Sequence, residues 1–466
     1  MPQNYILLQS VSINANATSF TFTNIPQSGY TDLKIVVSGR DSSSTGGSWN
    51  GYSFTILPNG LSTNLYQNSL FASGSSTAAY ADTQLYTPAE MSADTASTYS
   101  NVEIYIHNYL SAYPKSFQIV GVTEANASGA ATRIAGGTWS SASAISSLQF
   151  TAYSNWVAGT TFTLYGLAAV GTNPALPKAA GGDVIANDGT YWYHAFKSSG
   201  NFVVNTALTN VDFLVVAGGG GAGGGNTGSG GGGAGGLRTS AGTSGGGAAA
   251  ESKLTLAVGS YPVIVGGGGN GGMFYAPGAT QISGTNGTNS SFHTITSVGG
   301  GVGGGFSMAP AGPGTAGGSG GGGGGEYLGS GNPGGAGTAN QGYAGGAGFT
   351  DNSSYRSFGG GGGAGAVGAG GGTANAGGAG GAGVLLTAMS TATYTGVSGY
   401  YAGGGGGSNG GNVGAGGAGG GGAGGGVNGV ANTGGGGGGA NSTTTQAMRY
   451  TGNGGSGIVI IKYAMA

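Results

Sequence analysis

The chain has 466 residues, 116 of them glycine, with 5% charged residues, no cysteine and a formal net charge of -2. This balance offers no basic surface for nucleic acid and no polybasic membrane anchor, and the lack of cysteine excludes disulfides and thiolate metal sites. No apolar run approaches the ~20 residues that span a bilayer. The opening "MPQNYILLQS" has no basic stretch before a long apolar core, so we expect no secretory signal.

Residues 1–171 are predicted to form an all-β domain. The segment "NVEIYIH" places Val102, Ile104 and Ile106 on one face, and "SFTFT", "SFQIVGV", "SLQFTAY" and "TFTLYGL" continue the pattern between Ser, Asn and Gly clusters. Many short strands without a helical period predict a jelly-roll-like β-sandwich. We expect three tryptophans in its core or at its rim: Trp49, Trp139 and Trp156.

A Pro/Gly/Ala-rich linker, residues 172–182, precedes a glycine-rich domain at 183–466. Two strongly β-prone segments, 211–217 and 457–463, bracket the glycine-rich region 218–457, and we expect them to pair. The glycine-rich region is then an insertion between two paired strands, which hold its two ends together. An inner strand pair, "KLTLAV" and "YPVIVG", is expected to belong to the same small β-module.

The glycine-rich region is predicted to be ordered. Collagen is excluded, because it needs glycine at every third position and abundant proline, whereas this chain has 12 prolines and runs of consecutive glycines. A flexible linker carries more serine and charge. Ordering each glycine costs ~0.5–1 kcal/mol more than ordering alanine, and lateral N–H to C=O bonds between extended, three-residue-per-turn helices can offset this. We therefore predict a bundle of antiparallel polyglycine-II helices with variable tips; disorder is the alternative.

The frame "VDFLVVAGGGGAGGG … GGSGIVIIKY" resembles the glycine-rich domains of bacteriophage tail-fibre and adhesin proteins, over residues 183–466. The resemblance implies a sandwich of polyglycine-II helices with receptor-binding loops at its tip. The N-terminal part resembles a β-domain of virion proteins of marine and cyanobacterial phages, through "NIPQSGYTDLKIVVSGR" and "STYSNVEIYIHNYLSAYPKSFQIVGVTEANAS". A large N-terminal β-domain departs from the adhesin pattern and leaves the position on the particle open.

Large side chains between the glycine runs are the candidate binding residues. Tyrosine combines contact area with a low entropy cost, and arginine can fix hydroxyl groups. The alternative is that these side chains pack over the ends of the helices. The candidates are Tyr275, Tyr327, Tyr355, Arg356, Tyr400 and Tyr401. The cluster "YWYH" (Tyr191–His194) is expected to pack inside the small β-module instead.

No motif predicts catalysis, a cofactor or a metal. The three histidines (His107, His194 and His293) are far apart, without ligand spacing. GxGxxG matches arise by chance in such a composition, no P-loop lysine follows a glycine, and a calcium-binding repeat needs regular aspartates where the region has only Asp351.

We therefore expect a non-enzymatic virion protein, synthesised in the host cytoplasm. Its N-terminal domain is expected to attach it to other virion proteins, as a homo-oligomer, and its loops to bind a host surface glycan or outer-membrane protein. The alternative is a capsid decoration or appendage protein with a purely structural role. A bacterial silk-like or sheath protein is a third hypothesis.

Overall fold

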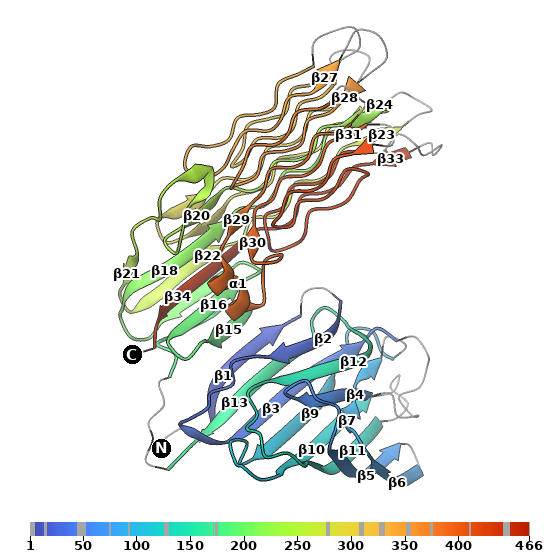
Figure 1. The fold of residues 1–466 in the computed structure, drawn as a ribbon, viewed down its shortest axis with the longest axis vertical. Coiled ribbons are helices and arrows are strands. Elements are labelled where there is room, and N and C mark those ends of the chain that lie inside the picture. The colour runs from blue at the N-terminus through green and yellow to red at the C-terminus, as the bar shows by residue number, and fades with distance from the viewer. Residues whose placement is uncertain are drawn as a thin grey trace. The chain divides into compact units, whose positions relative to one another are not determined.

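The computed structural model describes residues 5–13, 16–43, 53–73, 76–91, 94–124, 130–170, 172, 176–275, 280–306, 312–325, 331–350, 356–372, 376–409, 412–440 and 448–465. The chain divides into two compact units (Figure 1). Unit 1 comprises Met1–Pro177, Asp183–Trp192 and Met465–Ala466, and unit 2 comprises Lys178–Gly182 and Tyr193–Ala464. Most strands pair antiparallel. No helix in these described ranges is long and apolar enough to cross a membrane.

One large antiparallel sheet dominates unit 1. Its strands follow one another in the order β15–β1–β13–β3–β9–β10–β11–β5–β6. Their bounds are β15 (Val184–Asn187), β1 (Tyr5–Ser12), β13 (Thr161–Ala168), β3 (Tyr30–Asp41), β9 (Ser100–His107), β10 (Lys115–Glu124), β11 (Ala130–Trp139), β5 (Leu65–Ser73) and β6 (Ser76–Asp82).

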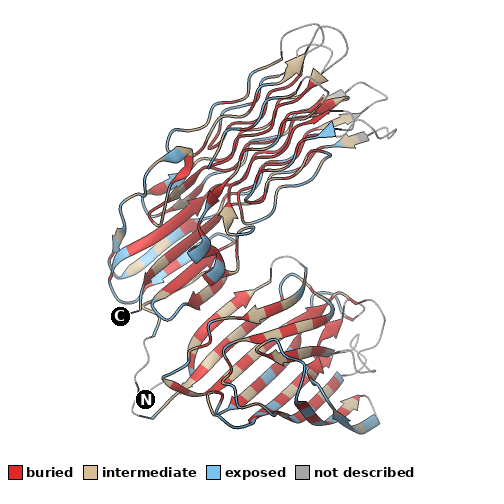
Figure 2. Cartoon of the chain, in the orientation of Figure 1, coloured by how far each residue is buried: buried red, intermediate tan, exposed pale blue. Residues whose placement is uncertain are grey.

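The central strands β9, β10 and β11 each have one buried and one open face, as the alternating colours in Figure 2 show. In β9 the predicted inward residues Val102, Ile104 and Ile106 are fully buried, while Glu103 lies on the open face. The expected alternation is therefore confirmed for this strand. Successive side chains of a strand point to opposite faces, so one apolar set fixes which residues the other face presents.

A second set of strands covers the buried face of the large sheet. It runs β2 (Ala17–Phe22), β12 (Leu148–Trp156), β4 (Ser53–Pro58) and β7 (Leu85–Pro88), and the short β8 (Glu90–Met91) pairs in parallel with β3. Aromatic rings join the two sets: Phe162 of β13 stacks on Phe20 at 4.6 Å and meets Trp156 edge-on at 5.1 Å. Trp139 and Trp156 are core residues, as expected; Trp49 lies outside the described residues.

Unit 2 begins with a small β-module around β18 (Leu208–Val216). β18 pairs with β34 (Ile458–Ala464) from Asp212–Lys462 to Val216–Ile458, so the two expected bracketing strands lie side by side. β16 (Tyr191–Phe196) pairs with the other edge of β34, and β20 (Leu237–Thr239) and β21 (Leu254–Leu256) pair with β18. The buried Asp212 carboxylate holds this module together, because it accepts from Lys253 at 3.1 Å and lies 3.3 Å from the Lys462 ammonium.

A second sheet completes the module. Its strands are β14 (Ala179–Ala180), β17 (Gly200–Val204), β22 (Gly259–Ile264), β25 (Ser290–Phe292) and β26 (Ile295–Ser297). The expected inner pair is thus divided, because β21 pairs with β18 and β22 pairs with β17 and β25. Trp192, Tyr193 and His194 are buried and Tyr191 is half-buried, so most of "YWYH" packs in a core. The His194 ring lies between the carbonyl of Gly181 at 2.7 Å and the hydroxyl of Tyr463 at 3.0 Å, and burial lowers the pKa of His194 to about 4.

The rest of unit 2 contains short elements and glycine runs that belong to no strand. The short elements are β19 (Gly228–Ser229), η2 (Gly245–Gly247), β23 (Met273–Tyr275), β24 (Thr280–Ile282), β27 (Phe349–Thr350), β28 (Arg356–Ser357), β29 (Val384–Leu385), α1 (Thr387–Thr393), β30 (Tyr400–Tyr401), β31 (Ser408–Asn409), β32 (Asn412–Val413) and β33 (Met448–Tyr450). The helix α1 departs from the expected all-β fold. It ends at Tyr394, whose left-handed backbone lets its N–H return to the carbonyl of Ser390.

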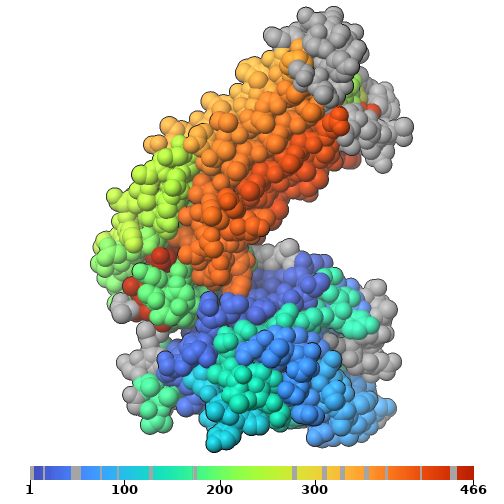
Figure 3. Space-filling view, viewed as in Figure 1, coloured from blue at the N-terminus to red at the C-terminus, as the bar shows by residue number. Residues whose placement is uncertain are grey.

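The glycine runs are joined sideways by backbone hydrogen bonds that repeat every three residues. In the innermost run, residues 218–223, amides three apart donate to the same neighbouring run. The donor–acceptor pairs are Gly218–Thr288 with Gly221–Thr285, Gly219–Gly455 with Ala222–Gly452, and Gly220–Gly233 with Gly223–Gly230. The carbonyls of this run accept from three further runs, through the amides of Gly300 and Gly303, of Gly269 and Gly272, and of Gly437. Six neighbouring runs thus surround this one. Figure 1 shows the runs side by side along unit 2, and Figure 3 shows those on the outer face packed against one another.

Most positions in these runs have no room for a side chain. A Cβ added to Gly322 would stand 2.0 Å from the carbonyl oxygen of Gly359, and one added to Gly231 would stand 2.1 Å from that of Gly405. Real Cβ atoms do not approach oxygen so closely. The neighbouring backbones therefore occupy the space that a side chain would take, which explains why glycine fills the runs.

Candidate functional site

One end of unit 2 gathers short strands from segments far apart in the sequence. β23 pairs with both β24 and β33, β31 pairs with β19 and β32, and β27 pairs with β28. Figure 1 places β23, β24, β27, β28, β31 and β33 at the end of the glycine runs remote from β18 and β34, and β19 and β32 join them by pairing with β31. We call this the distal end, defined by β19, β23, β24, β27, β28, β31, β32 and β33.

The structure brings two of the predicted binding residues to the distal end. Tyr275 closes β23, with its backbone opposite Met448 of β33. Arg356 opens β28, and its guanidinium lies over the ring of Phe306, 4.9 Å from the centroid. Tyr327 and Tyr355 lie outside the described residues.

Arg356 lies against a buried aromatic pair. Phe306 and Phe358 meet edge-on at 6.2 Å, and both are almost fully buried. The side-chain amide of Asn409 in β31 donates to the backbone carbonyl of Arg356, which ties β28 to β31. A guanidinium over an aromatic face is attracted by the ring quadrupole, so Arg356 is held in place at this end.

Tyr400 and Tyr401 lie elsewhere. Both belong to β30, which pairs with β29 beside α1, at the end of the glycine runs near the β-module (Figure 1). Tyr401 is fully buried, its hydroxyl lies 2.7 Å from that of Thr395, and burial raises its pKa to about 12. Tyr401 is therefore a packing residue, and neither tyrosine can share a surface with Arg356. The spacing of large residues between runs does not predict at which end they emerge, because the chain reverses after each run.

Three exposed side chains at the distal end were not predicted. Tyr450 in β33 is 63% exposed, Ile282 in β24 49% and Val413 in β32 44%. Tyr450 follows the rule that selected the other candidates, a tyrosine between glycine runs, whereas that rule passes over the aliphatic Ile282 and Val413. Tyrosine exposed on a held backbone is a good contact residue because little conformational entropy is lost on binding.

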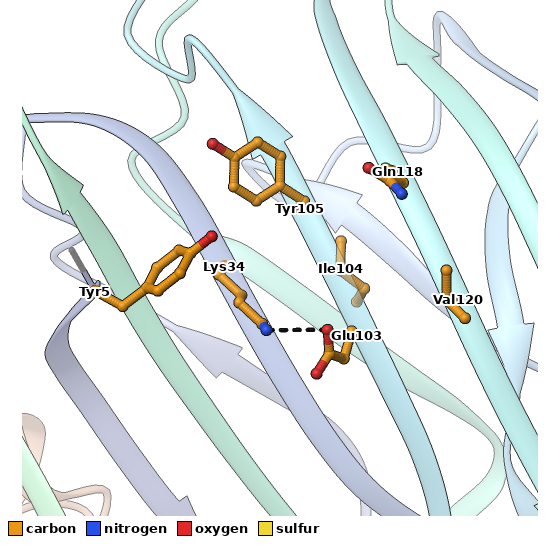
Figure 4. Close-up of a pocket in the computed structure, with 7 residues that line it drawn as sticks. All are labelled: Tyr5, Lys34, Glu103, Ile104, Tyr105, Gln118 and Val120. Carbon is orange, nitrogen blue, oxygen red and sulfur yellow. Dashed lines mark ion pairs between the residues drawn. The ribbon is translucent and has the colours of Figure 1, made fainter.

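A second candidate surface lies on the open face of the large sheet in unit 1. It is a hollow of about 320 Å³. Figure 4 shows the side chains that line it, among them Tyr5 of β1, Lys34 of β3, Glu103 and Tyr105 of β9 and Gln118 of β10. The Lys34 ammonium lies 2.9 Å from the Glu103 carboxylate and 5.5 Å from the centroid of the Tyr5 ring.

A buried carboxylate positions Tyr105 in the lining of this hollow. Asp32 accepts from the hydroxyl of Tyr105 and, at 2.9 Å, from the backbone N–H of Asn108, and the His107 ring lies 3.2 Å away. The Tyr105 ring is thus held in one orientation. Among the residues that the structure describes, no group of three or more His, Asp or Glu side chains is placed to hold a metal ion.

Comparison with known families identifies the second unit. A family model described as "Glycine-rich domain" matches residues 197–464, more than half of the chain, and the chain belongs to this family. No curated protein and no solved structure matches the chain.

Proposed function

We propose that the glycine runs of unit 2 are polyglycine-II helices packed into one bundle. A helix with three residues per turn directs every third amide to the same side. The three-residue repeat of the hydrogen bonds from residues 218–223, and the six runs around them, support this assignment. The same proposal takes unit 1 as a jelly-roll-like sandwich, supported by the aromatic contacts between its two sets of strands.

The function that this geometry supports best is that of a bacteriophage tail-fibre protein or adhesin. The supporting observation is that hairpin strands from distant parts of the sequence gather at the distal end of a laterally bonded scaffold. Such a scaffold lowers the entropy lost when the displayed residues bind a host surface glycan or outer-membrane protein. Copies of the chain on one virion, as a homo-oligomer held to other virion proteins by unit 1, would add individually weak contacts.

The test is competition for adsorption by the purified full-length chain. Pre-incubating bacteria with the protein should slow adsorption of a phage that encodes it. Arg356→Ala and Tyr450→Ala should weaken this competition, because both side chains belong to the distal end. Tyr113→Ala, which removes a side chain 76% exposed in unit 1, is the matched control and should compete as well as the wild type.

Labelling the chain on intact particles separates the alternatives. An antibody signal at the tail with effective competition supports the adhesin. A signal spread over the head, with no competition by the purified chain, contradicts the adhesin and indicates a capsid decoration protein.

A further inference from the structure

A row of residues in register crosses the open face of the large sheet in unit 1. From β3 to β5 the row consists of Lys34, Tyr105, Gln118, Gly136 and Asn68. Neighbouring strands lie ~4.8 Å apart, so these five strands carry a row about 19 Å long. The row therefore suits an extended ligand better than a compact one.

Gly136 leaves the centre of the row open between two hollows. On one side of Gly136 lies the hollow of about 320 Å³, which Lys34, Tyr105 and Gln118 line. On the other side lies a hollow of about 370 Å³, which Asn68 lines. A Cβ built on Gly136 would have no atom within 4 Å. Any side chain at this position would rise between the two hollows, and glycine leaves this part of the face without one.

The row combines a fixed aromatic ring with carboxamides that have unused hydrogen-bonding capacity. The Tyr105 hydroxyl is committed to Asp32, so its ring is held in place. Within the part of the chain that the structure describes, the carboxamides of Gln118 and Asn68 make no hydrogen bond, and both residues are exposed. An apolar ring face in line with groups that both donate and accept matches a ligand with apolar ring faces and many hydroxyls.

The charges and the backbone exclude two other kinds of ligand. The Lys34 ammonium is paired with Glu103 at 2.9 Å, and Asp32 adds a further negative charge, so the row has no excess of positive charge for an anionic polymer. β9, β10 and β11 are each paired on both sides, which leaves no free strand edge for an added peptide strand. The ligand must be recognised by side chains alone.

We infer that this row is a binding site for a neutral oligosaccharide lying across β3, β9, β10, β11 and β5. Tyr105 supplies a stacking face, Gln118 and Asn68 bind ring hydroxyls, and Gly136 lets the chain of sugars pass between the hollows. This site belongs to unit 1 and is independent of the function proposed for the distal end.

The test is isothermal titration calorimetry of the full-length protein with cellohexaose, maltohexaose, mannohexaose and chitohexaose. At least one should bind with a dissociation constant below about 1 mM. Gln118→Ala should weaken that binding about tenfold, through the loss of one hydrogen-bonded contact. Gly136→Leu should abolish it by blocking the row.

The controls separate a lost site from a lost fold. Gly136 has open space beside it and needs no left-handed backbone, so Gly136→Leu should keep the melting temperature of unit 1. Tyr113→Ala, away from the row, should bind like the wild type. The inference is overturned when none of the four hexasaccharides binds, or when binding survives both Gln118→Ala and Gly136→Leu.

Discussion

Replacing Gly268 by alanine should destabilise unit 2, whereas the same change at the adjacent Gly267 should not. A Cβ at Gly268 would stand 1.9 Å from the carbonyl oxygen of Gly454, where ordinary contact begins at 3.4 Å. A Cβ at Gly267 would meet only the hydroxyl of Thr288, at 3.9 Å. Both glycines lie in one run and neither has a left-handed backbone. A difference in stability between the two variants therefore measures the effect of the clash with the neighbouring run alone.

The cost follows from the bonds that join these two runs. Relieving the contact requires a separation of about 1.5 Å, which breaks the lateral bonds between the runs. These are Thr451 to Gly272 at 3.1 Å, Gly454 to Gly269 at 2.8 Å and Gly457 to Gly266 at 2.8 Å. At about 1 kcal/mol net for each bond, we expect Gly268→Ala to lower the free energy of unfolding by ~3 kcal/mol. Gly267→Ala should be neutral, or stabilising by ~0.4–1 kcal/mol because alanine restricts the unfolded chain.

Urea unfolding of the two variants and the wild type measures the difference, and thermal unfolding provides a second reading. A loss of ~3 kcal/mol should lower the melting temperature of unit 2 by roughly 6–12 °C. Equal stability of Gly268→Ala and Gly267→Ala would refute the reasoning, because the run would then not be confined by its neighbour.

Two further predictions concern the β-module. The pKa of His194 is lowered from 6.5 to about 4, so the unfolded chain takes up the proton first and stability falls by ~1.4 kcal/mol per pH unit between those values. Urea unfolding from pH 7.5 to 4 should show this slope in the wild type and in the exposed control His293→Gln, but not in His194→Gln. If His194→Gln keeps the slope, another group causes the pH dependence of stability. Asp212→Ala should lower the free energy of unfolding by ~2–3 kcal/mol, because it removes the buried carboxylate that Lys253 and Lys462 share. Glu103→Gln, at an exposed pair, should lower it by at most ~1 kcal/mol in the same assay. Similar losses for these last two variants would contradict the role of Asp212.

The sequence predicts the strands of this protein much better than the arrangement of its glycine runs. Alternation marks a strand wherever one face is buried, as in β9, and a long apolar segment marks β18 and β34 even 242 positions apart. The runs have no such signal, because consecutive glycines are chemically alike and nothing distinguishes the neighbour of one from the neighbour of another. Which end a residue reaches depends on that arrangement, so the sequence could not predict that Arg356 lies at the distal end and Tyr401 beside α1.

Short elements between the runs escape prediction for a related reason. The helix α1 has seven residues, too few to build a recognisable period, and it is held by the burial of Met389 and Ala392. The strands β21 and β22 look like a hairpin in the sequence, yet each pairs with a strand from another segment. The row from Lys34 to Asn68 depends on the register of five strands, which only the structure supplies.

Amide hydrogen exchange in the innermost runs is the most direct test of the central claim, that glycine backbones bond sideways into a firm scaffold. Every backbone amide of residues 218–223 and 230–236 donates a hydrogen bond to a neighbouring run. Peptides covering them should therefore exchange several orders of magnitude more slowly than an unstructured peptide of the same sequence, with protection close to that of β18 and β34. Exchange at the rate of the unstructured peptide, with β18 and β34 still protected, would contradict the scaffold and the display of the distal end that depends on it.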